Sequence, residues 1–220
     1  MNNELKKRIF TSIFLILLLT FMYLYSFVMI VALVIIAMIV WIEFYALISK
    51  ILSKNSFRDN SLRFLFKSLS LLYLILLVYF IFAIESYYPH LKLFLLYTIL
   101  VAILSDIGGL IIGKTFKGKK LTKISPNKTI SGSIGSFIFS LFLLPFFYED
   151  LIVYSFSSLT LITILISFMS QLGDLFISFL KRKAKVKDTS DILPGHGGFL
   201  DRLDGIIFTI PIGILLFGIF

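Results

Sequence analysis

Long apolar runs separated by short charged segments are the main feature of the chain. Seven runs lie at roughly residues 9–25, 28–49, 66–84, 92–113, 131–147, 157–180 and 205–220. A helix needs about 20 residues to cross the hydrocarbon core, so the first, fifth and last runs are short for a span. The pattern predicts an all-α, polytopic integral membrane protein with about seven transmembrane helices.

The first run follows a basic cluster, Lys6-Lys7-Arg8, as the apolar region of a signal peptide does. No small-x-small cleavage pattern follows this run, and the second run starts directly after it. We therefore expect the first run to remain as an uncleaved anchor.

Composition supports the membrane interpretation and limits the metal chemistry. Of the 220 residues, 59% are hydrophobic and 15% are charged, which is outside the range of soluble domains. The chain has no cysteine, so it has neither disulfides nor a thiolate metal site. A metal would need oxygen or histidine ligands, and oxygen ligands favour Mg²⁺, Ca²⁺ or Mn²⁺ over zinc.

The net charge of +9 by itself is compatible with nucleic-acid binding, but the basic residues form short clusters between the apolar runs. This distribution is the one that the positive-inside rule describes, so we expect no nucleic acid as a partner. With the N-terminus inside, 20 of the 21 basic residues lie on the inner side, and Lys92 alone lies outside. The sequence therefore predicts a cytosolic N-terminus.

Small residues at intervals of four mark two expected helix contacts. Gly109 pairs with Gly113, and Gly132 continues through Ser136 to Ser140. Such stripes let transmembrane helices approach closely.

Three acids lie inside predicted spans. Glu43, Asp106 and Asp174 precede the first lysine after their span by similar intervals, which places them roughly 10–12 Å below the cytosolic edge. A lone ionised carboxylate there costs at least ~2.5 kcal/mol. The three acids could converge on one cavity that holds cations, or each could be satisfied separately by snorkelling, water or local hydrogen bonds. Asp174 ends a polar face that includes Gln171 and Ser178, and this face leads into the last charged segment.

That segment, residues 178–204, combines both signs of charge with glycines. Its cations are Lys181, Arg182, Lys183, Lys185, Lys187 and Arg202, and its acids are Asp188, Asp191, Asp201 and Asp204. His196 lies in a Gly-His-Gly-Gly turn. The Asp-x-x-Asp spacing suits a metal, and the cations suit phosphate. His196 either serves only the turn, or it donates a hydrogen bond to phosphate or pyrophosphate, or carries a proton.

A second polar segment precedes the fifth run. It runs from Ser105-Asp106-x-Gly108 to Ser125-Pro126-Asn127-Lys128-Thr129. Hydroxyls, lysines and glycines before a helix start are typical of phosphate binding, and Thr129 or Ser131 could cap the helix. The alternative is a positive-inside loop followed by an ordinary cap.

Together these segments resemble a known family. The spacing Ser178-x-Leu180-Lys181-Arg182, then Lys187-Asp188-x-Ser190, then Leu193-Pro194-x-His196-Gly197-Gly198-Phe199-x-Asp201-Arg202-Leu203-Asp204 resembles the signature of phosphatidate cytidylyltransferases (CDP-diacylglycerol synthases). With the Ser-Asp-x-Gly and Ser-Pro-x-Lys-Thr segments, the resemblance covers roughly residues 105–204. Members often have Trp-Glu-Gly after Lys-Thr, where this chain has Ile130-Ser131-Gly132, and this chain is shorter than typical members.

The resemblance implies transfer of CMP from CTP to phosphatidic acid, giving CDP-diacylglycerol and pyrophosphate. It implies Mg²⁺, as one or two cations, at Asp174, Asp201 and Asp204, with Asp106 and Glu43 as further candidates. The expected catalytic residues are Asp174, Lys187, Asp188, His196, Asp201, Arg202 and Asp204. The expected substrate-binding residues are Ser125, Lys128, Thr129, Lys181, Arg182, Gly197 and Gly198.

The resemblance also implies an organisation and a location. Residues 1–91 would be N-terminal membrane helices, and residues 92–220 a catalytic membrane region with cytosolic loops at 114–130 and 181–204. The expected location is a bacterial-type inner membrane with the active site facing the cytosol. A homodimer is one of the assemblies that we expect.

Other functions stay open at this point. A CTP-dependent, kinase-like enzyme acting on lipid alcohols is the main alternative. A cation transporter would explain the intramembrane acids but not the basic, glycine-rich segment. A CDP-alcohol phosphotransferase shares the Asp201-x-x-Asp204-Gly205 opening, but its later Ala-Arg and second acidic pair do not follow here. A non-catalytic scaffold would not need acids clustered at one depth.

Overall fold

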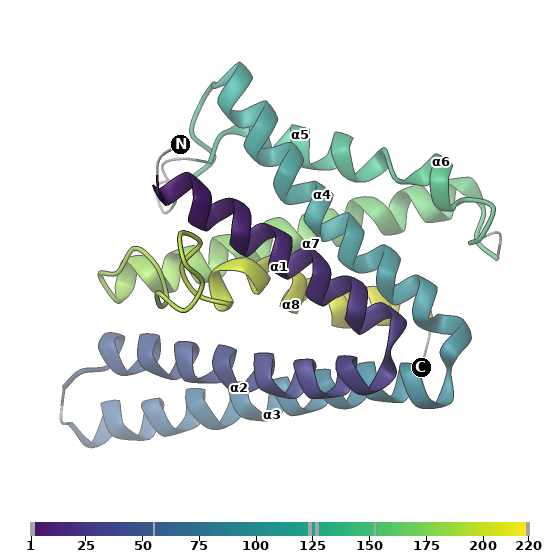
Figure 1. The fold of residues 1–220 in the computed structure, drawn as a ribbon. Helices are drawn as coiled ribbons and strands as arrows, with labels where there is room; N and C mark the ends of the chain where they lie inside the picture. Colours follow the sequence, from purple (N-terminus) through teal and green to yellow (C-terminus); the bar gives the residue numbers. More distant parts are fainter. Residues whose placement is uncertain (1–2, 55, 123–124, 126–127, 152, 219–220) are drawn as a thin grey trace. The chain divides into compact units, whose positions relative to one another are not determined.

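The computed structural model describes residues 3–54, 56–122, 125, 128–151 and 153–218. Within these residues the chain is helical, with seven helices of at least 12 residues, a short α6 and a 3-10 turn η1 (Figure 1). The elements are α1 (Asn3–Leu24), α2 (Ser26–Ile51), α3 (Phe57–Tyr87), η1 (Pro89–Leu91), α4 (Lys92–Phe116), α5 (Ile130–Leu141), α6 (Leu144–Phe147), α7 (Phe156–Lys183) and α8 (Leu200–Leu216).

Six helical segments are long and apolar enough to cross a membrane, which confirms the predicted all-α membrane class. They are Lys6–Leu24, Ser26–Ile51, Phe57–Tyr87, Pro89–Phe116, Ile130–Phe147 and Phe156–Lys183. The seventh predicted run forms most of α8, which has 17 residues and is not among the six.

Several helices continue into segments that were expected to be loops. Helix α3 begins at Phe57, about nine residues before the predicted run, and α7 continues through Lys183. Hydropathy marks only the apolar part of a helix, whereas lysine and arginine are themselves good helix formers. The three cations in the last turn of α7 also face the negative end of the helix dipole. The charged loop is therefore shorter than expected, at residues 184–199.

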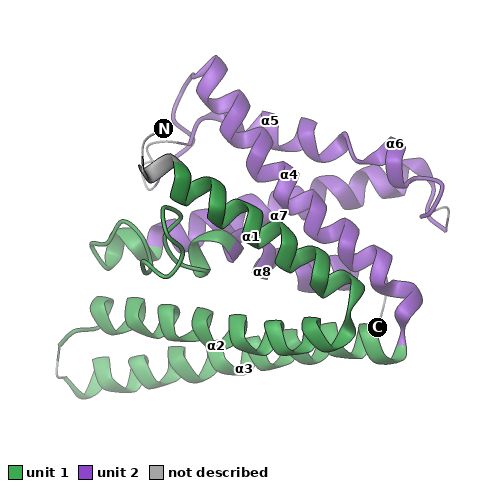
Figure 2. Cartoon of the chain, viewed as in Figure 1, with its two compact units in different colours: residues 1–87, 180–202 green, residues 88–179, 203–220 purple. Residues whose placement is uncertain are grey.

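The chain forms two compact units (Figure 2). Unit 1 contains residues 1–87 and 180–202, and unit 2 contains residues 88–179 and 203–220. The charged segment after α7 thus belongs to the same unit as the first three helices, although more than 90 residues separate them in the sequence.

Unit 1 is built on the hairpin of α2 and α3, which lie side by side (Figure 1). Its buried apolar residues include Val40 and Leu47 on α2 and Ile81 and Ile84 on α3. The break between α1 and α2 is a single extended residue, Tyr25.

Unit 2 depends on close packing of α4 against α5. A Cβ atom on Gly109 would lie 2.7 Å from the Ser136 hydroxyl, and one on Gly132 would lie 2.8 Å from the Gly109 carbonyl oxygen. These contacts confirm that the two small-residue stripes lie between helices. A core around Tyr97, Leu159 and Phe217 packs the rest of the unit.

Candidate active site

Residues 180–202, which belong to unit 1, carry most of the predicted site residues. Within them, we call residues 184–199, between α7 and α8, the signature loop. Its centre is a tight turn in which the N–H of Leu193 donates to the Gly197 carbonyl at 2.8 Å and the N–H of His196 donates to the Leu193 carbonyl at 2.9 Å. Gly195 and Gly197 have φ of +76° and +84°, which L side chains rarely adopt. Two glycines of the Gly-His-Gly-Gly sequence, Gly195 and Gly197, therefore allow the backbone to adopt this turn.

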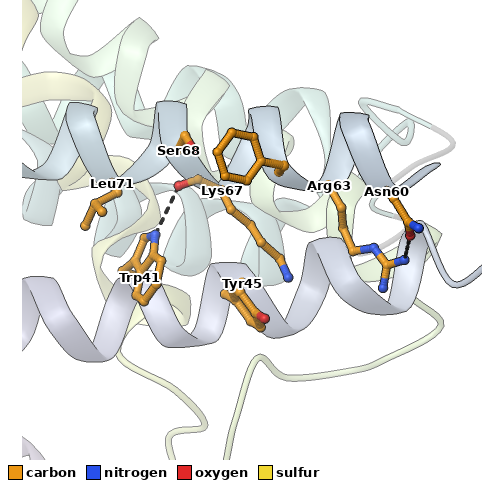
Figure 3. A pocket seen from close by; sticks show the side chains of 8 residues that line it. Trp41, Tyr45, Asn60, Arg63, Lys67, Ser68 and Leu71 are labelled. Atoms are coloured by element: carbon orange, nitrogen blue, oxygen red, sulfur yellow. Dashed lines mark hydrogen bonds between the residues drawn. The ribbon is translucent and has the colours of Figure 1, made fainter. Parts of the chain in front are cut away.

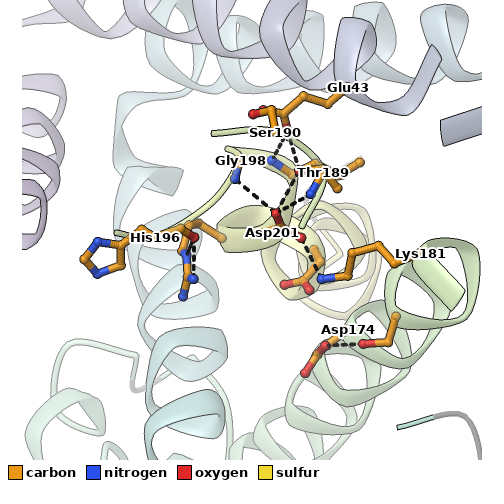
Figure 4. A network of polar contacts seen from close by, with 12 residues as sticks. Glu43, Asp174, Lys181, Thr189, Ser190, His196, Gly198 and Asp201 are labelled. Carbon is orange, nitrogen blue, oxygen red and sulfur yellow. Dashed lines mark hydrogen bonds and ion pairs between the residues drawn. The ribbon is translucent and has the colours of Figure 1, made fainter. Parts of the chain in front are cut away.

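Asp201, in the first turn of α8, is the acceptor that joins this loop to α7 (Figure 4). Its Oδ1 accepts from Lys181 Nζ at 2.6 Å, and its Oδ2 accepts from the N–H of Thr189 at 2.7 Å and the N–H of Gly198 at 3.0 Å. The side chain is only 3% exposed. Burial alone would raise the pKa of Asp201, but the hydrogen bonds from Lys181, Thr189 and Gly198 outweigh it and hold the pKa below its ordinary value.

Glu43 on α2 holds the loop from the other side. Its carboxylate accepts from Ser190 Oγ at 2.5 Å, the N–H of Phe199 at 3.1 Å and the N–H of Leu200 at 2.7 Å. The residue is 2% exposed. Leu200 is the first residue of α8, so Glu43 satisfies donors at a helix start from a distant part of the chain.

Thr189 connects the two carboxylates. Its hydroxyl oxygen lies 3.0 Å from Glu43 Oε2 and 2.9 Å from Asp201 Oδ2. A hydroxyl has one proton, so it donates to one carboxylate at a time. Gly198 fits into the same network: a Cβ atom there would lie 2.5 Å from Glu43 Oε1 and would also strike the Thr189 hydroxyl. The sequence therefore needs glycine at position 198 for packing.

His196 and Arg202 are neighbours at the edge of the loop. Arg202 donates to the His196 backbone carbonyl through Nε at 2.9 Å and through Nη2 at 2.5 Å. The His196 Nε2 atom lies 3.4 Å from the Ser12 hydroxyl of α1. Partial burial, followed by the positive charges of Arg202 and Arg8, lowers the pKa of His196. The imidazole is thus biased towards its neutral form.

Most of the other predicted residues of unit 1 are open to solvent. Arg182, Lys187 and Asp188 are exposed, and Gly197 is half-buried beside Asp188. The structure therefore separates a fixed frame, made by Glu43, Asp201 and their donors, from exposed cations next to it.

Unit 2 brings the second polar segment to the polar face of α7. Lys128 forms an ion pair with Asp174, and Ser178 Oγ donates to Asp174 Oδ1 at 3.2 Å. Thr129 caps α5, since its Oγ1 accepts from the N–H of Gly132 at 3.1 Å. The cap was predicted, but the pairing of Lys128 with Asp174 was not.

Further contacts fix this region. Ser133 Oγ donates to Gln171 Oε1 at 2.5 Å, which ties α5 to α7. Ser125 is described, and its carbonyl accepts from the N–H of Lys128 at 3.1 Å, whereas Pro126 and Asn127 lie outside the described residues.

Two more predicted acids lie in unit 2. Asp204 is buried, and its Oδ1 accepts from the N–H of Gly205 at 2.9 Å. Asp106 lies exposed on α4.

The carboxylates differ in how well they fit a metal. Over the described part of the chain, no three histidine, aspartate or glutamate side chains form a group that could hold a metal ion. Asp174 is partly exposed, with its side chain at 29%, and its partners are one lysine and one hydroxyl. Its oxygens are of the kind that Mg²⁺ takes as ligands, and a cation there would have to displace only Lys128. At Asp201, donors from its own unit already occupy both oxygens, and a metal would have to displace Lys181.

Comparison with known proteins shows the family of the chain. The model of the cytidylyltransferase family matches residues 1–220. The chain belongs to the cytidylyltransferase family.

Relatives of this family member carry one shared name. A phosphatidate cytidylyltransferase of Bacillus subtilis (strain 168) is 34% identical over 172 residues, which is 77% of this chain and 63% of the relative. The protein of that name from Staphylococcus haemolyticus (strain JCSC1435) is 45% identical over 122 residues, 54% of this chain and 46% of the relative. That of Helicobacter pylori (strain J99) is 37% identical over 124 residues, 56% and 47%. The chain thus spans between about half and two thirds of these curated relatives.

Proposed function

We propose that this protein is a phosphatidate cytidylyltransferase, which makes CDP-diacylglycerol and pyrophosphate from CTP and phosphatidic acid in phospholipid biosynthesis. The observation that carries the proposal is the family match over residues 1–220, with relatives of that name at 34–45% identity. The polar frame of the signature loop supports it, because Glu43 and Asp201 fix a segment rich in cations and glycine.

In this reaction a phosphate oxygen of the lipid attacks the α-phosphorus of CTP. A new P–O bond forms there, the bond from the α-phosphorus to its bridging oxygen breaks, and pyrophosphate leaves with the electron pair. Positioning and charge compensation supply most of the catalysis in such transfers. The lipid phosphate is already ionised at neutral pH, so the reaction needs no strong general base.

We assign the cations of unit 1 to phosphate binding. Arg182 and Lys187 are exposed next to the fixed frame, and Lys181 would bind substrate phosphate by exchanging its bond with Asp201. Arg202 would act through the His196 carbonyl that it holds, and through its exposed guanidinium. Asp188 beside Gly197, the glycine turn and the neutral imidazole of His196 would complete this side of the site.

In unit 2 we assign Asp174 and Asp204 to Mg²⁺. Asp201 of unit 1 is a further candidate ligand, which Lys181 would first have to leave. Bound Mg²⁺ neutralises charge on the reacting phosphates and orients them. Lys128 would leave Asp174 for a substrate phosphate, and Ser125 and Thr129 would hold the segment that carries it. Glu43 is better suited to hold the loop than to bind metal, because four donors surround its carboxylate.

We further propose seven membrane spans, with α8 as the last, and a cytosolic N-terminus. The support is the clustering of 20 of the 21 basic residues on one side of such an arrangement. The site would then face the cytosol, where CTP is found, and the bacterial relatives favour a cell membrane as the location.

The test is a pair of labelled substrates. Purified protein in micelles receives phosphatidic acid or diacylglycerol with Mg²⁺ and CTP labelled at either the α- or the γ-phosphorus. We expect labelled lipid only from α-labelled CTP with phosphatidic acid. Labelled lipid from γ-labelled CTP with diacylglycerol would identify the kinase-like alternative and overturn the proposal.

A further inference from the structure

A pocket in unit 1 lies away from the signature loop, between α2 and α3 (Figure 3). Its volume is about 470 Å³, and its walls include Trp41 and Tyr45 of α2 and Arg63, Phe64, Lys67 and Leu71 of α3. It lies between the C-terminal part of α2 and the N-terminal part of α3. Lys50 in the last turn of α2, Lys54 after it and Arg58 at the start of α3 make this end of the hairpin basic.

The pocket is positively charged. Arg63 and Lys67 are one helical turn apart on α3, and no acidic residue is among the described residues that line the pocket. Lys67 Nζ lies 3.0 Å from the centroid of the Tyr45 ring, and Arg63 donates to the Asn60 side-chain oxygen. In the described part of the chain, these two cations thus contact a neutral ring and a neutral amide, which leaves both available to an anionic ligand.

Apart from Asn60 and Ser68, the rest of the wall is aromatic or apolar, and Phe64 and Leu71 in it are exposed. Phe64 is 75% exposed, and Leu71 and Leu72 are 40% and 53% exposed, along helices that are long and apolar enough to span a membrane. Aromatic rings beside basic residues are typical of the level of the lipid headgroups, and basic pockets between spans bind lipid phosphates. A free nucleotide or phosphate would use the cations but not the apolar surface that leads away from them.

We propose that this pocket binds an anionic phospholipid of the bilayer, with its phosphate at Arg63 and Lys67 and its acyl chains along the exposed face of α2 and α3. This site is separate from the one assigned to catalysis, because none of the residues assigned to the reaction lines the pocket.

Helix α2 links the pocket to the signature loop, because it contributes residues to both. Trp41 and Glu43, and likewise Glu43 and Tyr45, are two residues apart and so differ by about 200° around the helix axis. One face of α2 therefore forms the pocket, and the opposite face carries the carboxylate that holds Ser190 and Leu200. A lipid in the pocket would fix the helix that supports the loop.

Trp41 is the single tryptophan of the chain, so its fluorescence reports on the pocket alone. The full chain is reconstituted in phosphatidylcholine nanodiscs that contain a small fraction of phosphatidylglycerol or phosphatidylcholine with identical dibrominated acyl chains, which quench tryptophan. We expect quenching by the anionic lipid to saturate at low mole fraction, with a preference on the order of tenfold over the zwitterionic lipid. Equal quenching by the two lipids would overturn the proposal, and this comparison needs no variant.

Two double variants with the same change of charge locate the effect. Arg63→Gln/Lys67→Gln should lose the preference, whereas Lys54→Gln/Arg58→Gln, two exposed cations outside the pocket, should keep it. Loss of the preference in both would show a general surface attraction and contradict a site.

A competition separates the lipid from a soluble anion. Inorganic phosphate in large excess, at constant ionic strength, should leave the quenching unchanged. Displacement of the brominated lipid by inorganic phosphate would show an anion site without lipid selectivity, and this too would overturn the proposal.

Discussion

The carboxylate of Glu43 accepts the backbone N–H of Leu200 at 2.7 Å, although 157 positions separate the two residues. The bond links a buried acid of the second helix to the first residue of the last one. The same carboxylate also accepts from Thr189, Ser190 and Phe199, so one side chain holds the signature loop at two places, within it and where it joins α8.

Glu43→Gln should therefore damage the loop. All four partners of Glu43 are donors, and the glutamine amide would place its own N–H groups against them. We expect a loss of roughly 1–3 kcal/mol in the free energy of unfolding, together with a large loss of activity. Glu85→Gln is the control, because Glu85 accepts from Ser26 at the far end of the α2–α3 hairpin. Full recovery of activity at high Mg²⁺ with normal stability would instead indicate that Glu43 binds metal.

Asp201 should make stability depend on pH in the acidic range. Its pKa in the folded protein lies below the ordinary 3.8, so its ionised form stabilises the fold above that pH. The contribution is lost as the pH falls through the lowered pKa. The difference in unfolding free energy between the parent and Asp201→Asn should be constant from neutral pH down to about 4 and shrink below it. Asp191→Asn, an exposed loop acid, should show no such trend; a constant difference at all pH values would refute the assignment.

The sequence predicted the frame of this site only in part. It marked Glu43 as an acid inside a span, but not what it binds, because its partners are two hydroxyls and two backbone N–H groups more than 140 positions away. It marked Asp201 and Asp204 by their spacing, which suits a metal and a helix start equally well. Only the structure shows that Lys181, Thr189 and Gly198 converge on Asp201.

The helices were more predictable than their ends. The apolar runs located every long helix, because burial in lipid demands continuous hydrophobic residues. Arg63 precedes the predicted run 66–84, yet it lies on α3, since charge does not interrupt a helix. The ion pair of Lys128 with Asp174 depends on how α5 packs on α7, and no local pattern reports that packing.

Arg202→Lys should reduce activity although the charge is kept. Arginine donates two hydrogen bonds to the His196 carbonyl, and lysine cannot reproduce this planar fork. The loss of one charge-assisted hydrogen bond corresponds to about a tenfold fall in kcat/KM. Arg58→Lys, outside the site, serves as the control. Turnover within about twofold of the parent would favour a purely topological role for the charge, since that corresponds to well under 1 kcal/mol.

Asp174→Asn tests the metal assignment. The variant keeps the shape of the side chain but loses the charge that a cation requires, so it should fold, lose nearly all activity and lose any Mg²⁺-dependent rise in Tm. Asp150→Asn, an exposed acid beyond the membrane helices, should behave as the parent. An active Asp174→Asn protein with the parent's Mg²⁺ shift would exclude Asp174 as a ligand.

The topology can be checked without activity. Reporter domains fused before α1 and after Phe220 should report opposite sides of the membrane if α8 is a seventh span, with the N-terminal reporter cytosolic. Reports from the same side would mean that α8 does not cross.

The most direct test of cytidylyl transfer follows the oxygen atoms. Phosphatidic acid with ¹⁸O in its phosphate group is incubated with unlabelled CTP and Mg²⁺, and both products are analysed by mass spectrometry. If the lipid phosphate attacks the α-phosphorus, all of the ¹⁸O stays in CDP-diacylglycerol and the pyrophosphate contains none. Appearance of ¹⁸O in pyrophosphate, or formation of a lipid diphosphate in place of CDP-diacylglycerol, would contradict the proposed reaction.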